Sequence, residues 1–173
     1  ENQINMHTNS KKKKRLATNT MSSVNNTNIS ITKRDGRKEP LDINKLHFVV
    51  EEACEGLPGV SASQIEMNAN IQFYDGMTTK DIQNVLIRSA NDLISLETPN
   101  YQFAASRLLL YDVRKEAHGQ YEYIPLLKLI LRNIKLGVYD RGIVEKYTKS
   151  EIKRLNTWIR RERDLKFTYA GLR

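Results

Sequence analysis

Residues Ile31 to Lys45, ITKRDGRKEPLDINK, decide the local fold of this chain, because they join a turn signal to a helix start. Asp35-Gly36 predicts a β-hairpin with a two-residue type I′ turn, since both central positions need a positive φ that Asp and Gly tolerate. Asp42 stands at an N-cap position. Apolar residues with helical spacing come after it, namely Ile43, Leu46, Val49, Val50 and Ala53. A hairpin that carries Lys33 and Arg34 beside a helix N-terminus forms a cradle for phosphate oxygens; the alternative is a solvated basic hairpin.

Three further helices are predicted before residue 119. Their start signals are Ser61 with Gln64 (a capping box), Thr78 or Thr79, and Thr98 followed by Pro99. The first of these helices is expected to extend to about Tyr74. Together with the helix after Asp42 they make four helices with short connections, which favours a small helical bundle with the hairpin over one end as a lid.

The helical pattern continues beyond Gly119. Two helices are expected there, one with Leu126, Leu127, Ile130, Leu131 and Ile134, and one capped by Thr148 and Glu151. Their apolar residues lack a partner surface within the chain, so we expect an exposed apolar face. The predicted organisation is a polar, disordered tail over 1–30, a first domain over 31–118 and a helical segment over 119–173.

Composition limits the classes of protein. Lys and Arg number 28 against 20 Asp and Glu, for a net charge of +8. Half of that excess comes from the tail, where Lys11 to Arg15 supply five positive charges against Glu1. The remaining charge suits binding of small anions without requiring nucleic acid. A single cysteine, Cys54, excludes an internal disulfide and a multi-cysteine zinc site, and fits a reducing, intracellular location.

Two more motifs carry a family resemblance together with the opening stretch. They are Tyr74–Gln83 (YDGMTTKDIQ) and Thr98–Leu108 (TPNYQFAASRL). In this order the three motifs resemble the ATP-cone of the large (alpha) subunit of class Ia ribonucleoside-diphosphate reductase, a domain that switches overall activity. The resemblance continues through His118–Glu122 and Arg163–Tyr169, which are similar to the segment after the cone in that subunit.

The resemblance implies a mainly α fold: a small β-hairpin lid over a four-helix bundle, then helices that open an α/β barrel truncated here. It implies ATP and dATP as allosteric effectors, with Mg²⁺, and no catalytic residue and no metal-binding residue in this fragment. The implied partners are the rest of the large subunit, the small radical-bearing subunit and further copies of the enzyme, in the cytoplasm. The chain begins with Glu1, so we expect a fragment or an over-extended reading frame, with Met21 as a start.

Nucleotide-binding residues carry over position by position. The resemblance assigns Lys33, Glu39, Pro40, Leu41, Asp42, Ile43, Asn44, Lys45, Thr79, Arg88 and Lys115 to the nucleotide site. The chemistry is consistent, because lysines suit phosphates while carboxylate and amide groups hydrogen-bond adenine edges. Single-residue alternatives exist: Thr79 as a helix cap, Lys115 as a cation at a helix C-terminus and Glu39 as a cross-strand partner of a lysine.

Two positions depart from the pattern. Some members carry histidines near the nucleotide phosphates where this chain has Gln83 and Asp112. A carboxylate at Asp112 repels phosphate unless it faces away or holds Mg²⁺, so the strength of dATP binding and inhibition is open.

Two other classes of protein are alternatives. An ATP-cone transcriptional regulator would carry a four-cysteine zinc ribbon, and residues 1–30 contain no cysteine. A basic helical nucleic-acid-binding module would bind duplexes with a strong salt dependence. The sequence contains no run of eighteen apolar residues, so it does not predict a membrane span. His47 is expected to be packed or on the surface, not a metal ligand.

Overall fold

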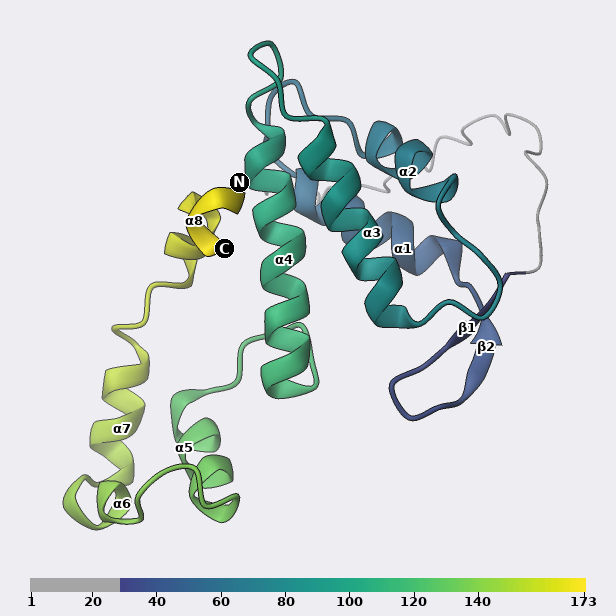
Figure 1. The fold of residues 1–173 in the computed structure, drawn as a ribbon. Coiled ribbons are helices and arrows are strands. Elements are labelled where there is room, and N and C mark those ends of the chain that lie inside the picture. The colour runs from purple at the N-terminus through teal and green to yellow at the C-terminus, as the bar shows by residue number, and fades with distance from the viewer. Residues whose placement is uncertain (1–28) are drawn as a thin grey trace, which may run out of the picture.

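The computed structural model describes residues 29–173. The predicted tail and its basic run therefore lie outside the described residues, apart from Ile29 and Ser30. Strand β1 (Ser30–Thr32) pairs antiparallel with β2 (Lys38–Pro40), with Thr32 opposite Lys38. The predicted hairpin is confirmed (Figure 1).

The hairpin turn is longer than the predicted two-residue type I′ turn. Residues 33–37 connect the strands, and the Gly36 N–H donates to the Lys33 carbonyl over 2.9 Å. Gly36 has a φ of +84°, the left-handed conformation that favours glycine. The Asp35 carboxylate accepts from the Arg37 backbone N–H and Nε, over 3.1 and 2.8 Å. Side-chain hydrogen bonding by Asp35 thus closes a wider turn, which the dipeptide signal could not distinguish from a tight one.

A segment far along the chain covers the outer edge of β1. The Thr32 N–H donates to the Met77 carbonyl over 2.9 Å, and the Gly76 N–H donates to the Ser30 carbonyl over 2.7 Å. These bonds satisfy an edge that would otherwise expose unpaired backbone groups. They also fix the hairpin beside the start of α3 (Thr79–Asp92).

Three of the four predicted helices begin where the sequence indicates. In α1 (Ile43–Cys54) the Asp42 carboxylate accepts from the N–H groups of Asn44 and Lys45. In α3 the Thr78 hydroxyl accepts from the Asp81 N–H over 3.1 Å. The two caps satisfy backbone donors that have no partner inside the helix.

Two of the four helices differ from the prediction in detail. Helix α2 (Ala62–Asn70) is capped by Ser61 as predicted but ends four residues before Tyr74. Helix α4 (Tyr101–His118) begins after Asn100, so Thr98 and Pro99 as N-cap and first helical residue were wrong. The Thr98 hydroxyl instead donates to the Leu93 carbonyl over 2.7 Å, closing the loop between α3 and α4.

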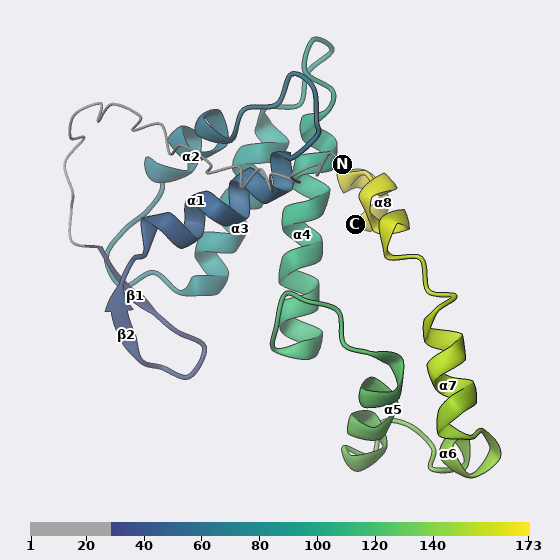
Figure 2. The same cartoon turned by 180° about the vertical axis from the view of Figure 1, so that it is seen from behind.

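The four helices pack around one apolar core. Its side chains come from all four helices and the hairpin, and those with no exposed surface are Val50, Ala53, Ile65, Ala69, Ala90, Ala104, Ala105 and Leu108. Ile43, expected on the inner face of α1, is 58% exposed because it is the first residue of the helix, and burial on this face begins one turn later at Leu46. The predicted bundle is confirmed, and the hairpin lies beside the N-terminus of α1 (Figures 1 and 2).

The segment after Gly119 is helical and extends away from the bundle before it returns. It comprises α5 (Leu126–Lys135), α6 (Gly142–Lys146), α7 (Lys149–Asn156), a 3₁₀ helix η1 (Arg161–Lys166) and α8 (Tyr169–Leu172). Helices α5 and α7 pack together, while α8 lies beside α4, where Tyr169 touches the core (Figures 1 and 2). The predicted capping box of Thr148 and Glu151 is present.

Ile130 of α5 and Ile152 of α7 are buried, and these two helices pack together, so the prediction that they lack a partner surface within the chain is wrong in part. Large apolar side chains are nevertheless exposed along this segment, as expected. They include Leu136, Val138, Trp158, Ile159, Leu165 and Phe167. Helices within 29–173 are all too short or too polar to cross a bilayer.

Candidate functional site

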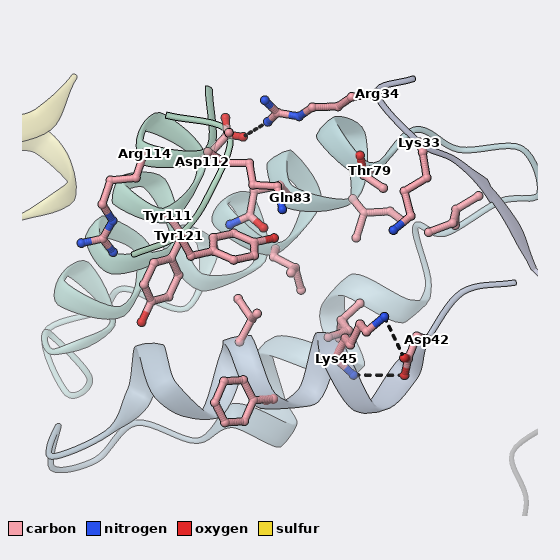
Figure 3. A pocket seen from close by; sticks show the side chains of 18 of the residues that line it. Lys33, Arg34, Asp42, Lys45, Thr79, Gln83, Tyr111, Asp112, Arg114 and Tyr121 are labelled. Carbon is pink, nitrogen blue, oxygen red and sulfur yellow. Dashed lines mark hydrogen bonds and ion pairs between the residues drawn. The ribbon is translucent and has the colours of Figure 1, made fainter. Parts of the chain in front are cut away.

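One large cavity, of about 1330 Å³, opens between the hairpin and the helices. Its walls are the hairpin, α1 from Asn44 to Glu52, the start of α3, the end of α4, residues 119–123 and Arg161 of η1, as Figure 3 shows in part. These segments are far apart in the sequence, and the fold brings their charged side chains together around one cavity. The cavity exceeds the range of about 300 to 1,000 Å³ typical of small-molecule pockets.

The hairpin supplies cations to one side of the cavity. Lys33 comes directly after β1, and its Nζ lies 2.7 Å from the Glu39 Oε1 on β2. Glu39 thus has the cross-strand lysine partner considered from the sequence, while both residues also line the cavity. An anionic ligand can compete with Glu39 for Lys33, because this ion pair is about one-third exposed at both ends.

The N-terminus of α1 forms the floor. The Asp42 carboxylate accepts hydrogen bonds from the backbone N–H groups of Asn44 and Lys45. Its Oδ2 also lies 3.4 Å from the Lys45 Nζ. These bonds lower the pKa of the Asp42 carboxyl, the hydrogen bond from the Lys45 backbone first among them. Asn44 and Lys45 line the cavity beside it, so a carboxylate, an amide and an ammonium group lie within one helical turn.

Helices α3 and α4 form the opposite side. Thr79 is the first residue of α3 and lines the cavity, while Thr78 makes the N-cap hydrogen bond. The role of helix cap therefore falls to Thr78, and Thr79 remains available to a ligand. Gln83, one turn further, is buried, and its amide donates to the Leu108 carbonyl over 2.8 Å.

Asp112 on α4 faces the cavity and is paired. Its Oδ1 lies 3.2 Å from the Arg34 Nη2, so the contact joins the hairpin turn to α4 (Figure 3). The Asp112 side chain is only 10% exposed. The condition raised from the sequence, that Asp112 faces away from the site, does not hold, because this residue lines the cavity wall.

Lys115 lies one turn beyond Asp112 in the last turn of α4. Its Nζ lies 4.1 Å from the centroid of the Tyr121 ring. Burial lowers the pKa of Lys115, and the positive charges of Arg34 and Lys33 lower it further. Arg34 and Lys33 thus repel Lys115, and a polyphosphate bound among them would relieve that repulsion.

Aromatic rings and guanidinium groups line the far end of the cavity. The Arg114 guanidinium lies 4.9 Å from the Tyr111 centroid and 4.6 Å from the Tyr123 centroid. Arg161, from η1, lies 4.7 Å from the Tyr123 ring, whose hydroxyl donates to Asp164. Burial raises the pKa of Tyr111 to about 12, so this phenol is neutral at physiological pH. Stacked cations of this kind are worth about 0.5–2 kcal/mol each and hold the wall in place.

Most of the predicted site residues come together here. Those that line the cavity are Lys33, Glu39, Leu41, Asp42, Asn44, Lys45, Thr79 and Lys115. Arg34, expected beside Lys33 in the phosphate cradle, lines it as well. Pro40, Ile43 and Arg88 are not among the lining residues, and all three are exposed. Arg88 lies on the outer face of α3, away from the cavity.

Sequence reasoning missed several lining residues. They are Arg37 in the turn, Phe48 and Glu52 on α1, and Tyr111, Arg114, Tyr121, Glu122, Tyr123 and Arg161. Helical spacing was a usable signal for Tyr111, which lies four residues before the predicted Lys115 on α4. No sequence signal places Arg161 there, because it comes from a separate element.

The arrangement suits binding, and no cysteine among the described residues lines the cavity. Cys54 is half-buried outside the cavity, and burial raises its thiol pKa to about 11. Within residues 29–173, no group of three or more His, Cys, Asp and Glu side chains is arranged to hold a metal ion. His47 lies on the surface of α1 between Glu51 and Glu66.

Comparison with known proteins agrees with this geometry. The family model described as ATP cone domain matches residues 29–116. Ribonucleoside-diphosphate reductase 1 subunit alpha of Escherichia coli (strain K12) is 43% identical over 148 residues, which are 86% of this chain and 19% of that protein. Ribonucleoside-diphosphate reductase subunit alpha of Helicobacter pylori (strain 26695) is 40% identical over 84% of this chain and 18% of its own length. The corresponding subunit of Haemophilus influenzae is 37% identical over 86% and 20%. The chain thus spans about a fifth of the length of these relatives.

Proposed function

Because the chain belongs to the ATP cone domain family, we propose that it is the nucleotide-sensing part of a ribonucleoside-diphosphate reductase alpha subunit. In this proposal ATP and dATP bind in the large cavity and control the activity of an enzyme that makes deoxyribonucleotides. Chemistry takes place outside this chain, whose own cysteine lies apart from the cavity.

The observation that carries the proposal is the grouping of Lys33, Lys45 and Lys115 on the wall of one cavity. They come from the hairpin, α1 and α4, and nothing in a folding role requires three lysines to face the same space. Lysine is a compact charge that suits phosphate oxygens. The N-terminus of α3 at Thr79 adds backbone N–H groups and a favourable dipole for the same oxygens.

The base and the sugar of a nucleotide need both hydrogen-bond donors and hydrogen-bond acceptors. Glu39, Asp42 and Asn44 place two carboxylates and an amide on the cavity wall. The ribose 2′-hydroxyl, which ATP has and dATP lacks, both donates and accepts hydrogen bonds, so such groups can distinguish the two nucleotides. Mg²⁺ would enter with the phosphates, which it usually retains as ligands together with water.

Control by these effectors requires differential binding to two states of a larger assembly. A ligand shifts an equilibrium only by its difference in affinity for the two states, and the coupling is reciprocal. We therefore place the rest of the alpha subunit, a small radical-bearing subunit and further copies of the enzyme as partners, in the cytoplasm. The exposed apolar side chains after Gly119 provide surface for such contacts.

Calorimetric titration of the chain with ATP and with dATP, each with Mg²⁺, tests the proposal. We expect saturable binding, and Lys33→Ala should weaken it at least about tenfold, about 1.4 kcal/mol, since a lost charge–phosphate contact costs this much or more. Lys149→Ala is the matched control, because Lys149 is exposed at the start of α7 and does not line the cavity. A folded chain that binds neither nucleotide, or equal losses in both variants, would refute the proposal.

A further inference from the structure

Resting on the proposed function, we propose that Asp112 acts as a built-in competitor of the nucleotide: it holds Arg34 in an ion pair that latches the hairpin, and the phosphates must displace it. The chemical class of the competing ligand is a polyphosphate anion. The latch is a property of this chain's own residues, visible as the 3.2 Å contact between Arg34 Nη2 and Asp112 Oδ1.

The Arg34–Asp112 contact restrains the hairpin turn. The other polar contacts of residues 33–37 within the described range are internal to the hairpin: Lys33 with Glu39, Arg37 with Asp35, and the backbone bonds of the turn. Among the hydrogen bonds and ion pairs within residues 29–173, the Arg34–Asp112 pair is thus the one that ties this turn to the helices, across 78 residues of sequence. Its loss would free the turn while the base of the hairpin stays held by the bonds between Thr32 and Met77.

The Arg34–Asp112 pair is partly exposed to solvent. The Asp112 side chain is 10% exposed and the Arg34 side chain 42%. A carboxylate withdrawn from water this far is costly without a partner, so Asp112 retains Arg34 when no other anion is bound. Arg34, being accessible, can turn to a phosphate, for which its guanidinium group is well suited.

Asp112 lies among the cations that a polyphosphate would contact. Lys115 lies three residues further along α4, and both residues line the cavity with Lys33 and Arg34. A negative charge at this position repels phosphate and also occupies one of its cationic ligands. Removing the charge should therefore strengthen binding. Only molecules without the Arg34–Asp112 pair bind fully, and the apparent Kd equals the intrinsic Kd divided by the fraction of such molecules.

The test compares Asp112→Asn with Glu116→Gln in the 173-residue chain. Glu116 is the matched control, since it lies one turn further along α4, pairs with Lys80 over 3.6 Å and does not line the cavity. Titration with ATP and Mg²⁺ should show a Kd lowered about fivefold or more by Asp112→Asn, within the usual range of coupling between sites. The Kd of Glu116→Gln should stay within about twofold, as expected for an exposed ion pair.

A double-mutant cycle separates the latch from simple repulsion. In an Arg34→Ala background the latch is already absent, so Asp112→Asn should lower the Kd by a smaller factor than in the native chain. Arg34→Ala alone should raise the Kd, because a phosphate ligand is lost. Equal factors in the two backgrounds would leave repulsion alone and overturn the latch.

Hydrogen exchange without nucleotide gives a second readout that is independent of binding. The amides of Lys33 and Gly36, hydrogen-bonded within the turn, should exchange faster in Asp112→Asn and Arg34→Ala but not in Glu116→Gln. Weaker nucleotide binding by Asp112→Asn would overturn the proposal, because Asp112 would then orient Arg34 for the ligand. Faster amide exchange together with no nucleotide binding by any variant would refute the nucleotide-binding function itself, and with it the role of the latch as a competitor.

Discussion

The surface side chain of His47 joins helices α1 and α2. Its Nδ1 lies 2.7 Å from Glu66 Oε1 on α2, and its Nε2 lies 3.1 Å from Glu51 Oε1 on α1. The hydrogen bond with Glu66 raises the pKa of His47 above its ordinary value of 6.5, with the charges of both carboxylates acting in the same direction. The protonated ring therefore links α1 to α2 through charge as well as through the packing of the bundle.

A pH dependence results from the direction of that shift. Because the folded pKa lies above the unfolded value, the contribution of His47 is fully present below about pH 6.5 and is lost as pH rises through the folded pKa. The free energy of unfolding in urea should fall more between about pH 5.5 and 8.5 for the native chain than for His47→Gln. The difference should be at most about 1 kcal/mol, as for exposed ion pairs. If the free energy of unfolding depends on pH identically in the two proteins, protonated His47 does not stabilise the fold.

Single residues also mark where prediction from sequence stops. Motifs place Lys33, Lys45 and Thr79 at the site, and these residues line the cavity. Motifs place Arg88 there as well, but the phase of α3 turns it to the outer surface. Asp112 is a recognisable departure, yet its pairing with Arg34 could not be predicted, because the two are 78 residues apart and meet only when the hairpin folds over the bundle.

At the scale of elements, helix α3 depends on its cap. The Thr78 hydroxyl accepts from the Asp81 N–H over 3.1 Å and donates to the Asp81 carboxylate over 2.6 Å. The same residue forms a backbone bridge with Thr32 of β1. The cap thus fixes the N-terminus of α3 at the point where the hairpin meets the bundle, next to Thr79.

Removing that cap should destabilise the bundle measurably. We expect Thr78→Ala to lower the free energy of unfolding by about 1 kcal/mol, the usual cost of a lost N-cap hydroxyl. Thr78→Ser keeps the hydroxyl and should retain most of the stability. Urea unfolding followed by circular dichroism measures both. A Thr78→Ala midpoint equal to that of Thr78→Ser would show that the hydroxyl contributes nothing.

At the scale of the whole molecule, the described part of the chain has two separate groups of buried apolar residues. One is the core of α1–α4 and the hairpin, which also receives Tyr169 of α8. The other contains Ile130 of α5 and Ile152 of α7, which are 8% and 1% exposed and do not belong to the main core. The two parts meet through α4, which contacts both η1 and α8.

This division predicts local unfolding. Ile152→Ala removes a buried side chain whose truncation usually costs about 2–5 kcal/mol. We expect faster amide hydrogen exchange in α5 and α7, with exchange in α3 and the first half of α4 unchanged. Leu108→Ala, in the main core, should instead accelerate exchange in α3 and α4. Uniform acceleration throughout the chain by Ile152→Ala would show one cooperative unit.

The sequence by itself determined the features that depend on neighbours along the chain. Asp42, Ser61, Thr78 and Thr148 cap their helices as expected, because a cap is a contact over two or three residues. The hairpin was predictable from residues 31–40 for the same reason. The tertiary structure alone decided how the hairpin turn is tied to α4 and how the far wall of the cavity is built. Those features depend on contacts between distant segments, such as Arg34 with Asp112 and Arg161 with Tyr123, whose geometry no local pattern encodes.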